Sequence, residues 1–157
     1  VVITPINHRG KAMSNEYKHV LVAIDHSDDS EKIVKQAIVV AQRNHAKITL
    51  LHVLEDINIA LGYELMPIIS EQTDTEIVSE AKRNARALAD RLGIPDADTH
   101  VVSAFSTKEG IIKTAESLQV ELVVVGAHTR QGLALLLGST SGSIINDSPC
   151  DILVVKV

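Results

Sequence analysis

Hydrophobic positions follow two alternating patterns along residues 17–157. Short, nearly continuous apolar runs lie at 19–24, 48–53, 99–104, 122–125 and 152–155. Such runs are typical of strands that are buried on both faces of a parallel sheet. Between them, apolar residues recur at helical spacing. The alternation predicts one α/β domain, an open five-stranded parallel sheet with helices on both faces.

Local signals predict where the helices begin and end. Asp28 and Glu31 have the spacing of a capping box at the start of the first helix. A long polar helix is predicted over 70–92, with Ile77 in its buried stripe and Gly93 just past its end. Two further helices are predicted, one with Thr107 as its N-cap and one over 139–146.

The N-terminal residues stand outside this alternation. We interpret 1–16 as an N-terminal extension or an expression remnant before a domain at 17–157, and Met13 is a candidate native start. No run reaches the roughly 18 apolar residues that a membrane helix needs, and the N-terminus lacks the layout of a secretion signal. We therefore expect a cytoplasmic protein with no membrane insertion.

The composition argues against several classes of function. A formal net charge of −5 and an aromatic content of 2% disfavour nucleic-acid binding, which depends on cationic patches and stacking aromatics. The single cysteine, Cys150, excludes an internal disulfide and is expected to be a small buried hydrophobe. The histidines show no metal-ligand spacing, and His19 and His26 are expected at the surface.

Candidate chemistry lies where two of the strands end. In open α/β sheets, ligands bind beyond the carboxyl ends of the strands, where the strand order reverses. The first strand ends at Asp25, and the fourth ends at Gly126, which opens a glycine-punctuated stretch up to Thr140. Glycines let the backbone approach an anion closely, and a helix start at Ser139 would add free N–H groups. The residues indicate a phosphate cradle over 126–140, with a tight strand-to-helix turn as the alternative.

The common nucleotide fingerprints are absent from the sequence. There is no Gly-x-x-x-x-Gly-Lys-[Ser/Thr] segment and no Gly-x-Gly-x-x-Gly segment. Their absence argues against a P-loop NTPase and against a dinucleotide dehydrogenase. No nucleophile elbow supports covalent catalysis either.

Three stretches of the chain, 17–27, 46–53 and most specifically 122–155, resemble the universal stress protein family. The resemblance implies the strand order 3-2-1-4-5 and a homodimer joined through the fifth strand. An apolar strand at a sheet edge favours such pairing on its own. The residues of that strand are Ile152, Leu153, Val154 and Val155.

The family has ATP-binding and non-binding branches, which differ in one motif. The binding branch has a glycine, two residues, a second glycine, nine residues and a closing glycine followed by Ser or Thr. Here Gly126, Gly138 and Ser139 match that motif. Thr129 stands in place of the second glycine, and eight residues separate it from Gly138. The closing pair favours the binding branch.

The resemblance also implies a set of residues around a bound nucleotide. Asp25 would approach the ribose or adenine, Ala23 would line the pocket, and Ile48 would pack on the adenine. Mg²⁺ or Mn²⁺ would bridge the phosphates. The residues expected around the ribose and phosphates are Gly126, His128, Thr129, Gly138, Ser139 and Thr140.

Two functions follow from these observations. The first is an ATP-binding or other adenine-nucleotide-binding regulatory protein of the stress response. It would be non-enzymatic or hydrolyse ATP very slowly, because no motif fixes a cation or a general base against the γ-phosphate. The alternative is a ligand-free dimeric interaction protein with an unknown protein partner. A nucleotidyl-transferring enzyme is disfavoured, since the His-x-Gly-His signature is absent.

Overall fold

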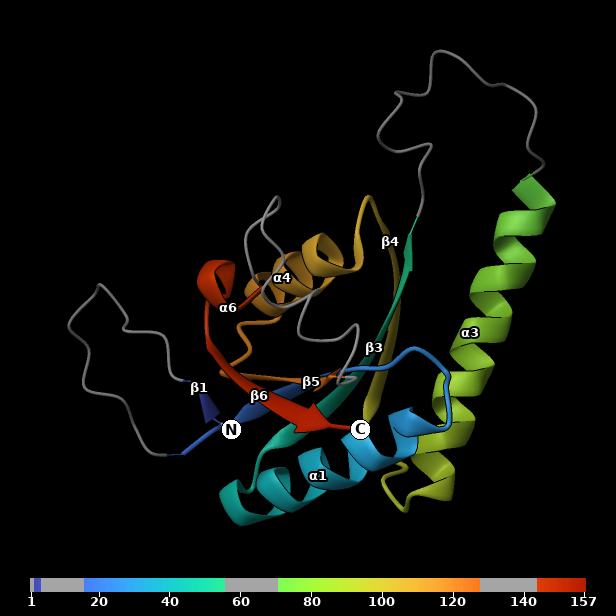
Figure 1. The fold of residues 1–157 in the computed structure, drawn as a ribbon. Coiled ribbons are helices and arrows are strands. Elements are labelled where there is room, and N and C mark those ends of the chain that lie inside the picture. Colours follow the sequence, from blue (N-terminus) through green and yellow to red (C-terminus); the bar gives the residue numbers. More distant parts are fainter. Residues whose placement is uncertain (1, 4–15, 56–70, 128–143) are drawn as a thin grey trace.

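The computed structural model describes residues 2–3, 16–55, 71–127 and 144–157, and their parallel strands form one sheet. The strands stand in the spatial order β4-β3-β2-β5-β6, with every neighbouring pair parallel (Figure 1). The predicted five-stranded sheet and its order 3-2-1-4-5 are confirmed. The strands are β2 (His19–Ala23), β3 (Lys47–Glu55), β4 (Asp98–Ala104), β5 (Leu122–Ala127) and β6 (Asp151–Lys156).

A short additional strand, β1 (Val2–Ile3), lies on the outer edge of β6 (Figure 1). It runs antiparallel to β6, with Val2 opposite Leu153 and Ile3 opposite Ile152. The hydrophobic pattern does not predict this strand, because two residues are too few to show a period.

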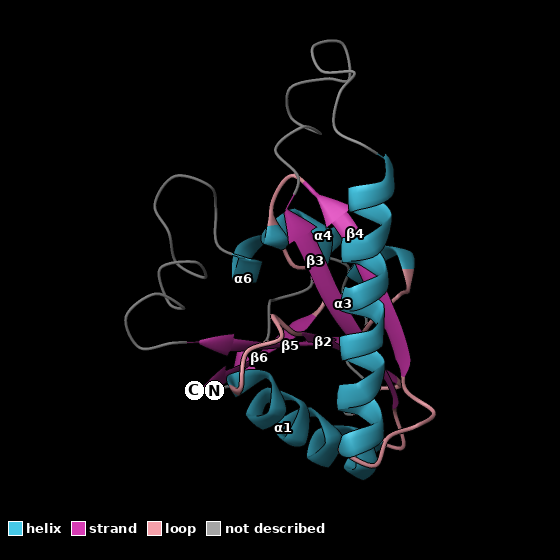
Figure 2. Ribbon diagram, turned by 90° about the vertical axis from the view of Figure 1, so that its right-hand side faces the viewer, coloured by secondary structure: helices cyan, strands magenta, loops and turns pink. Residues whose placement is uncertain are grey.

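Helices cover both faces of the sheet. On one face lie α1 (Asp29–Asn44) and α3 (Glu71–Arg91), which pack through residues such as Ile33 and Leu88. Figure 2 shows α3 running along β3 and β4. On the other face lie α4 (Thr107–Ser117) and α6 (Ile144–Asp147), which pack through Ile111 and Ile144. Ile77 was expected in the buried stripe of α3 but is 47% exposed, because that stripe begins at Ala81.

The strand residues of the core are buried, as the continuous apolar runs predict. In β2, Val20 and Val22 pack on the side of α1 and α3, and Leu21 packs on the side of α4 and α6. Successive side chains of a strand point to opposite faces, so a strand that is covered on both faces is apolar at nearly every position. The buried strands hold their carboxyl ends in fixed positions beside one another.

The predicted helix ends are partly confirmed. Gly93 follows α3 with φ 73°, the left-handed conformation that a glycine accepts without strain. Two capping predictions are wrong. Asp28 makes no side-chain capping bond to α1, and α4 is capped by Ser106, whose Oγ accepts a hydrogen bond from the Glu109 N–H at 3.2 Å. Thr107 is the first residue of α4, so its side chain is one position too late to cap the helix.

Candidate functional site

The strand order reverses between β2 and β5. Within the sheet, β3 and β4 follow β2 toward one edge, and β5 and β6 follow it toward the other edge. Val22 of β2 lies opposite Val124 of β5. Asp25 and Gly126 follow these two residues along the parallel strands, so both lie at the carboxyl edge of the reversal. This is where open α/β sheets bind their ligands.

The carboxylate of Asp25 is held in a fixed position by the turn that leads into α1. Its Oδ1 accepts hydrogen bonds from the Ser27 N–H at 3.0 Å, the Ser27 hydroxyl at 2.6 Å and the Ser30 hydroxyl at 2.9 Å. The Asp25 N–H in turn donates to Ser30 Oγ at 3.2 Å. Ser30 is buried, whereas Asp25 is exposed. The turn therefore anchors one end of the carboxylate and presents it to solvent.

These hydrogen bonds keep Asp25 ionised. Partial burial acts to raise the pKa of Asp25, but the hydrogen bonds from Ser27 and Ser30 outweigh it and hold the pKa below its usual value. All three donors to the side chain bind Oδ1. Within the described residues, Oδ2 has no donor, so it can accept a hydrogen bond from a hydroxyl or amino group of a ligand.

Two histidines are associated with this turn: His26 is part of it, and His52 lies in β3. The rings of His26 and His52 are in contact, with centroids 4.1 Å apart and planes inclined at 39°. His52 Nδ1 lies 3.0 Å from the carbonyl oxygen of Ile24. Burial, followed by the nearby His52, lowers the pKa of His26, although Asp25 and Glu80 act in the opposite direction.

His26 is therefore not the surface residue that the sequence suggested. Its Nε2 is buried and has no hydrogen-bond partner among the residues that the structure describes. The residue has φ 62°, a conformation that few non-glycine residues adopt. That backbone conformation accompanies the contact of the ring with His52.

Gly126 lies at the carboxyl end of β5, against the first turns of α1. A Cβ at this position would lie 2.4 Å from Ile33 Cδ1 and 3.2 Å from Ile33 Cγ1. The glycine therefore allows a close approach between β5 and α1. Because the turn from Asp25 to Ser30 leads into α1, this approach brings that turn close to the carboxyl end of β5.

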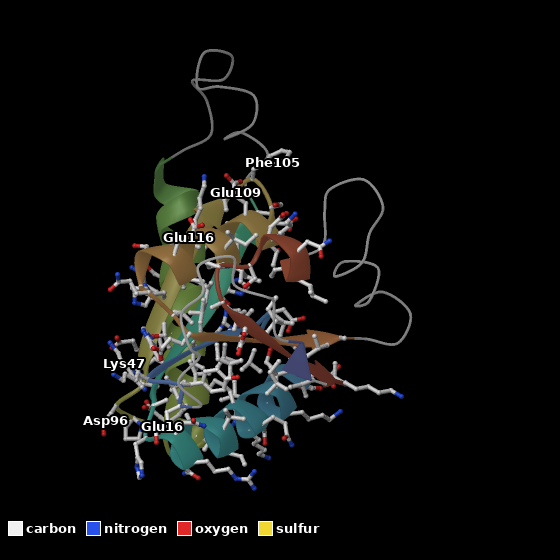
Figure 3. The ribbon with its side chains drawn as sticks, turned by 90° about the vertical axis from the view of Figure 1, so that its left-hand side faces the viewer. Glu16, Lys47, Asp96, Phe105, Glu109 and Glu116 are labelled. Carbon is white, nitrogen blue, oxygen red and sulfur yellow. The ribbon has the colours of Figure 1, made fainter. Side chains whose placement is uncertain are left out.

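The structure places the other expected residues as follows. Ala23 is the last residue of β2 and is half-buried, close to the Asp25 turn. Ile48 lies near the amino end of β3, opposite Val20, and is buried in the core. Its neighbour Lys47 lies at the opposite end of the molecule from Phe105, which follows the carboxyl end of β4 (Figure 3). The structure does not bring Ile48 together with Asp25.

Sequence reasoning missed Ser27, Ser30 and His52 as parts of the site. A signal was present for Ser27, since an Asp side chain commonly accepts a hydrogen bond from the backbone two residues further on. The pairing register of β2 and β3 places His52 near the turn, because Leu51 lies opposite Ala23 and His52 is the next residue along β3. The remaining expected residues, His128, Thr129, Gly138, Ser139 and Thr140, lie outside the described residues.

A concave region lies at the β4 edge of the sheet, between β4 and α4. This β4–α4 groove has a volume of about 320 Å³, and His100, Phe105 and Lys113 are among the residues that line it. Phe105 and Glu109, also in its wall, are seen in Figure 3. The groove shares no lining residue with the Asp25 turn or with Gly126.

Neither metal binding nor membrane spanning finds support in the part of the chain that the structure describes. No group of three or more His, Cys, Asp or Glu side chains there is placed to hold a metal ion. None of the helices in that part is both long and apolar enough to cross a bilayer.

Comparisons with known proteins agree with this fold. The sequence profile of the universal stress protein family matches residues 16–156. Universal stress protein A homolog 1 of Coxiella burnetii is 36% identical over 139 residues, which cover 88% of this chain and 96% of that protein. The strand order and the helices on both faces define an open, parallel α/β sheet protein. The chain belongs to the universal stress protein family.

Solved structures show the same fold. Universal stress protein UspA from Lactobacillus plantarum superposes with a TM-score of 0.65 at 26% identity, over 90% of this chain and 99% of that one. A universal stress protein crystallised in complex with cAMP superposes with a TM-score of 0.64 at 23% identity, over 90% of this chain and 98% of that one. The second likeness concerns the fold alone.

Proposed function

We propose that this protein binds an adenine nucleotide, ATP in the first place, at the turn that carries Asp25. It would act as a cytoplasmic regulatory protein of the stress response, in which the nucleotide is a ligand and not a substrate. One observation carries the proposal. Asp25 stands at the strand-order reversal with Oδ1 held by three donors and with no described donor on Oδ2.

The geometry of Asp25 suits the nucleoside part of such a ligand. A ribose hydroxyl or the adenine amino group is a donor, and an ionised carboxylate is the acceptor that binds a donor most strongly. Because Ser27 and Ser30 already fix the carboxylate, little side-chain entropy remains to be lost on binding. A universal stress protein of the same fold has been solved in complex with cAMP, a ligand with both adenine and ribose, which supports an adenine nucleotide as the class of ligand.

The phosphates would lie beyond Gly126, toward the stretch that ends at Thr140. The triphosphate of ATP on a chain of net charge −5 needs positive charge nearby. Mg²⁺ or Mn²⁺ carried by the phosphates would supply it without protein ligands. No motif of the sequence fixes a lysine, an arginine or a general base against the γ-phosphate. Binding without rapid hydrolysis is the function that fits.

The test is calorimetric titration of ATP with Mg²⁺ into Asp25→Asn and Asp28→Asn. Both variants lose one carboxylate, and Asp28 is an exposed residue that makes no capping bond to α1. Asp25→Asn is expected to weaken binding by about tenfold or more, the size of a lost charge-assisted hydrogen bond, while Asp28→Asn binds as the wild type does. Equal affinity of the two variants would refute the proposed role of Asp25.

The alternative of a ligand-free interaction protein is separated from nucleotide binding by a melting experiment. A ligand that binds the native state must raise its melting temperature. We expect ATP with Mg²⁺ at millimolar concentration to stabilise the wild type. No shift at that concentration would favour the interaction protein.

We also propose that two copies pair through the outer edge of β6. The strand is the last of the parallel strands, and its residues Leu153, Val154 and Val155 are only half-buried. β1 pairs with Ile152 and Leu153 of this edge, and an apolar strand edge that is paired over only part of its length is a template for a further strand. Concentration-dependent light scattering should show a dimer, and a monomer at every concentration would contradict the pairing.

A further inference from the structure

We propose that the N-terminal strand β1 competes with this self-association, because it occupies in cis the part of the β6 edge that a second copy would use. The inference rests on the proposed β6 homodimer and is independent of nucleotide binding. It assigns a role to residues 2–3, which precede the part of the chain that the family profile matches.

The competition follows from the ladder positions. β6 uses one edge for β5, along all of Asp151–Lys156. Its other edge pairs with β1, where Val2 lies opposite Leu153 and Ile3 opposite Ile152. Each backbone N–H and C=O on that edge can serve one neighbouring strand at a time. A second copy therefore cannot pair at these two positions while β1 is in place.

The cis contact is short enough to be displaced. β1 has two residues, whereas β6 has six. Two β6 strands paired antiparallel about a centre between Leu153 and Val154 would use all six positions of each. β1 has the advantage of a covalent tether, since only residues 4–18 separate it from β2, which keeps its effective concentration high.

The balance between the two pairings therefore depends on protein concentration. A tethered two-residue strand is favoured at low concentration, and the longer intermolecular ladder is favoured at high concentration. The second copy is the occupant that fits this edge, because it brings an apolar strand of equal length.

The first experiment locks β1 in place. Val2→Cys and Leu153→Cys are combined in a Cys150→Ser background, so that a disulfide can join two residues that lie opposite each other. Light scattering is expected to find the oxidised protein monomeric at a concentration where the reduced protein is dimeric. The Val2→Cys single variant in the same background is the control and should not respond to reductant.

The second experiment weakens β1 by replacing Val2 and Ile3 with proline, which removes both backbone donors. The control exchanges the two residues, Val2→Ile with Ile3→Val, and keeps the strand propensity. Releasing an edge that β1 occupies most of the time is expected to lower the apparent dimer dissociation constant by about tenfold. Circular dichroism and ATP titration should be unchanged, because neither residue belongs to the nucleotide site.

Three results bear on the proposal. Dimerisation that strengthens in the proline variant and is blocked by the disulfide supports it. Equal dissociation constants in the proline variant, the exchange control and the wild type would overturn the competition and leave the dimer standing. A proline variant that stays monomeric at all concentrations would overturn both the β6 dimer and the competition, while the ATP titration would still report on nucleotide binding.

Discussion

Gly126 of β5 and Ile33 of α1 are packed so closely that a Cβ at position 126 would lie 2.4 Å from Ile33 Cδ1. The contact explains why a glycine stands at position 126 without any need for a bound ligand. It also brings the start of α1, and with it the turn of Asp25, to the end of β5. The packing of β5 on α1 and the proposed nucleotide binding would therefore depend on the same residue, and the sequence motif alone does not separate the two roles.

Gly126→Ala is expected to destabilise the protein by about 1 kcal/mol, because Ile33 must leave its preferred rotamer to make room. Ile33→Val removes the Cδ1 atom that causes the conflict and by itself costs about 1 kcal/mol. In the Ile33→Val background, the alanine should cost clearly less. Urea unfolding of the four proteins measures this coupling, and an equal cost in both backgrounds would contradict the contact.

The hydrogen bonds to Asp25 predict a pH dependence of stability. The pKa of Asp25 is lower in the folded protein than its ordinary value of about 3.9. A carboxyl group with a depressed pKa stabilises the fold at pH values above its ordinary pKa. This contribution is lost as the pH falls through the pKa of the folded state. Asp25→Asn should therefore be less stable than the wild type at neutral pH, and the difference should shrink in acid.

Ser30→Ala tests the same network from the donor side. It removes the buried hydroxyl that lies 2.9 Å from Asp25 Oδ1, so the pKa of Asp25 should move up toward its ordinary value. Carboxyl resonances followed by NMR through an acid titration measure that pKa. A pKa of Asp25 that is unaffected by Ser30→Ala would rule out the proposed cause.

His26 predicts a second pH dependence, near neutrality. Its pKa is lowered in the folded protein, so the unfolded chain takes up a proton first, at about pH 6.5. Stability should therefore fall as the pH decreases from there toward the folded pKa. The groups acting on the ring are His52, which opposes the proton, and Asp25 and Glu80, which favour it.

His26→Asn is the matched variant, because asparagine tolerates a positive φ better than most residues. Unfolding by urea at a series of pH values should show a weaker pH dependence for His26→Asn than for the wild type. An identical slope in both proteins would show that His26 does not carry the effect.

Tyr17 and Asp151 form a polar contact at the other end of the sheet. The Tyr17 hydroxyl donates to Asp151 Oδ2 at 3.0 Å. Burial raises the pKa of Tyr17 to about 12, and the hydrogen bond and charge of Asp151 add to the rise. Tyr17→Phe should destabilise the fold by about 1 kcal/mol, the net value of a typical hydrogen bond.

The contact between Tyr17 and Asp151 also predicts how stability changes at alkaline pH. A tyrosine with a raised pKa stabilises the fold at pH values below the ordinary tyrosine pKa of about 10. This contribution is lost as the pH rises toward the folded pKa of about 12. The ultraviolet absorbance of tyrosinate should show a late ionisation that Tyr17→Phe removes. A Tyr17 that ionises at its ordinary value would contradict the contact.

The fold could be predicted from the sequence because its strands are buried on both faces. A fully apolar run such as Val20–Leu21–Val22 has few other locations in a protein of this size. The strand ends were predicted less well, since Lys47, Glu55 and Asp151 join the ladder without joining the apolar pattern. Their pairing depends on neighbouring strands, which no local pattern encodes.

The candidate site was predicted in part. Asp25 follows from its place at a strand end, whereas Ile48 was assigned from its motif and lies at the other end of β3. The buried Nε2 of His26 depends on a positive φ, and hydropathy carries no information about backbone dihedrals. The pairing of β1 depends on a contact between residues 2–3 and 152–153 that are far apart in the chain.

The most direct measurement is an ATP titration followed by backbone amide NMR of the wild type. Nucleotide binding at the strand-order reversal should shift the amides of Asp25, Ser27 and Ser30 together with those of Gly126 and Ala127, and should leave the β4–α4 groove unchanged. Shifts confined to the residues of that groove, or no shifts at saturating ATP with Mg²⁺, would contradict a nucleotide site at Asp25.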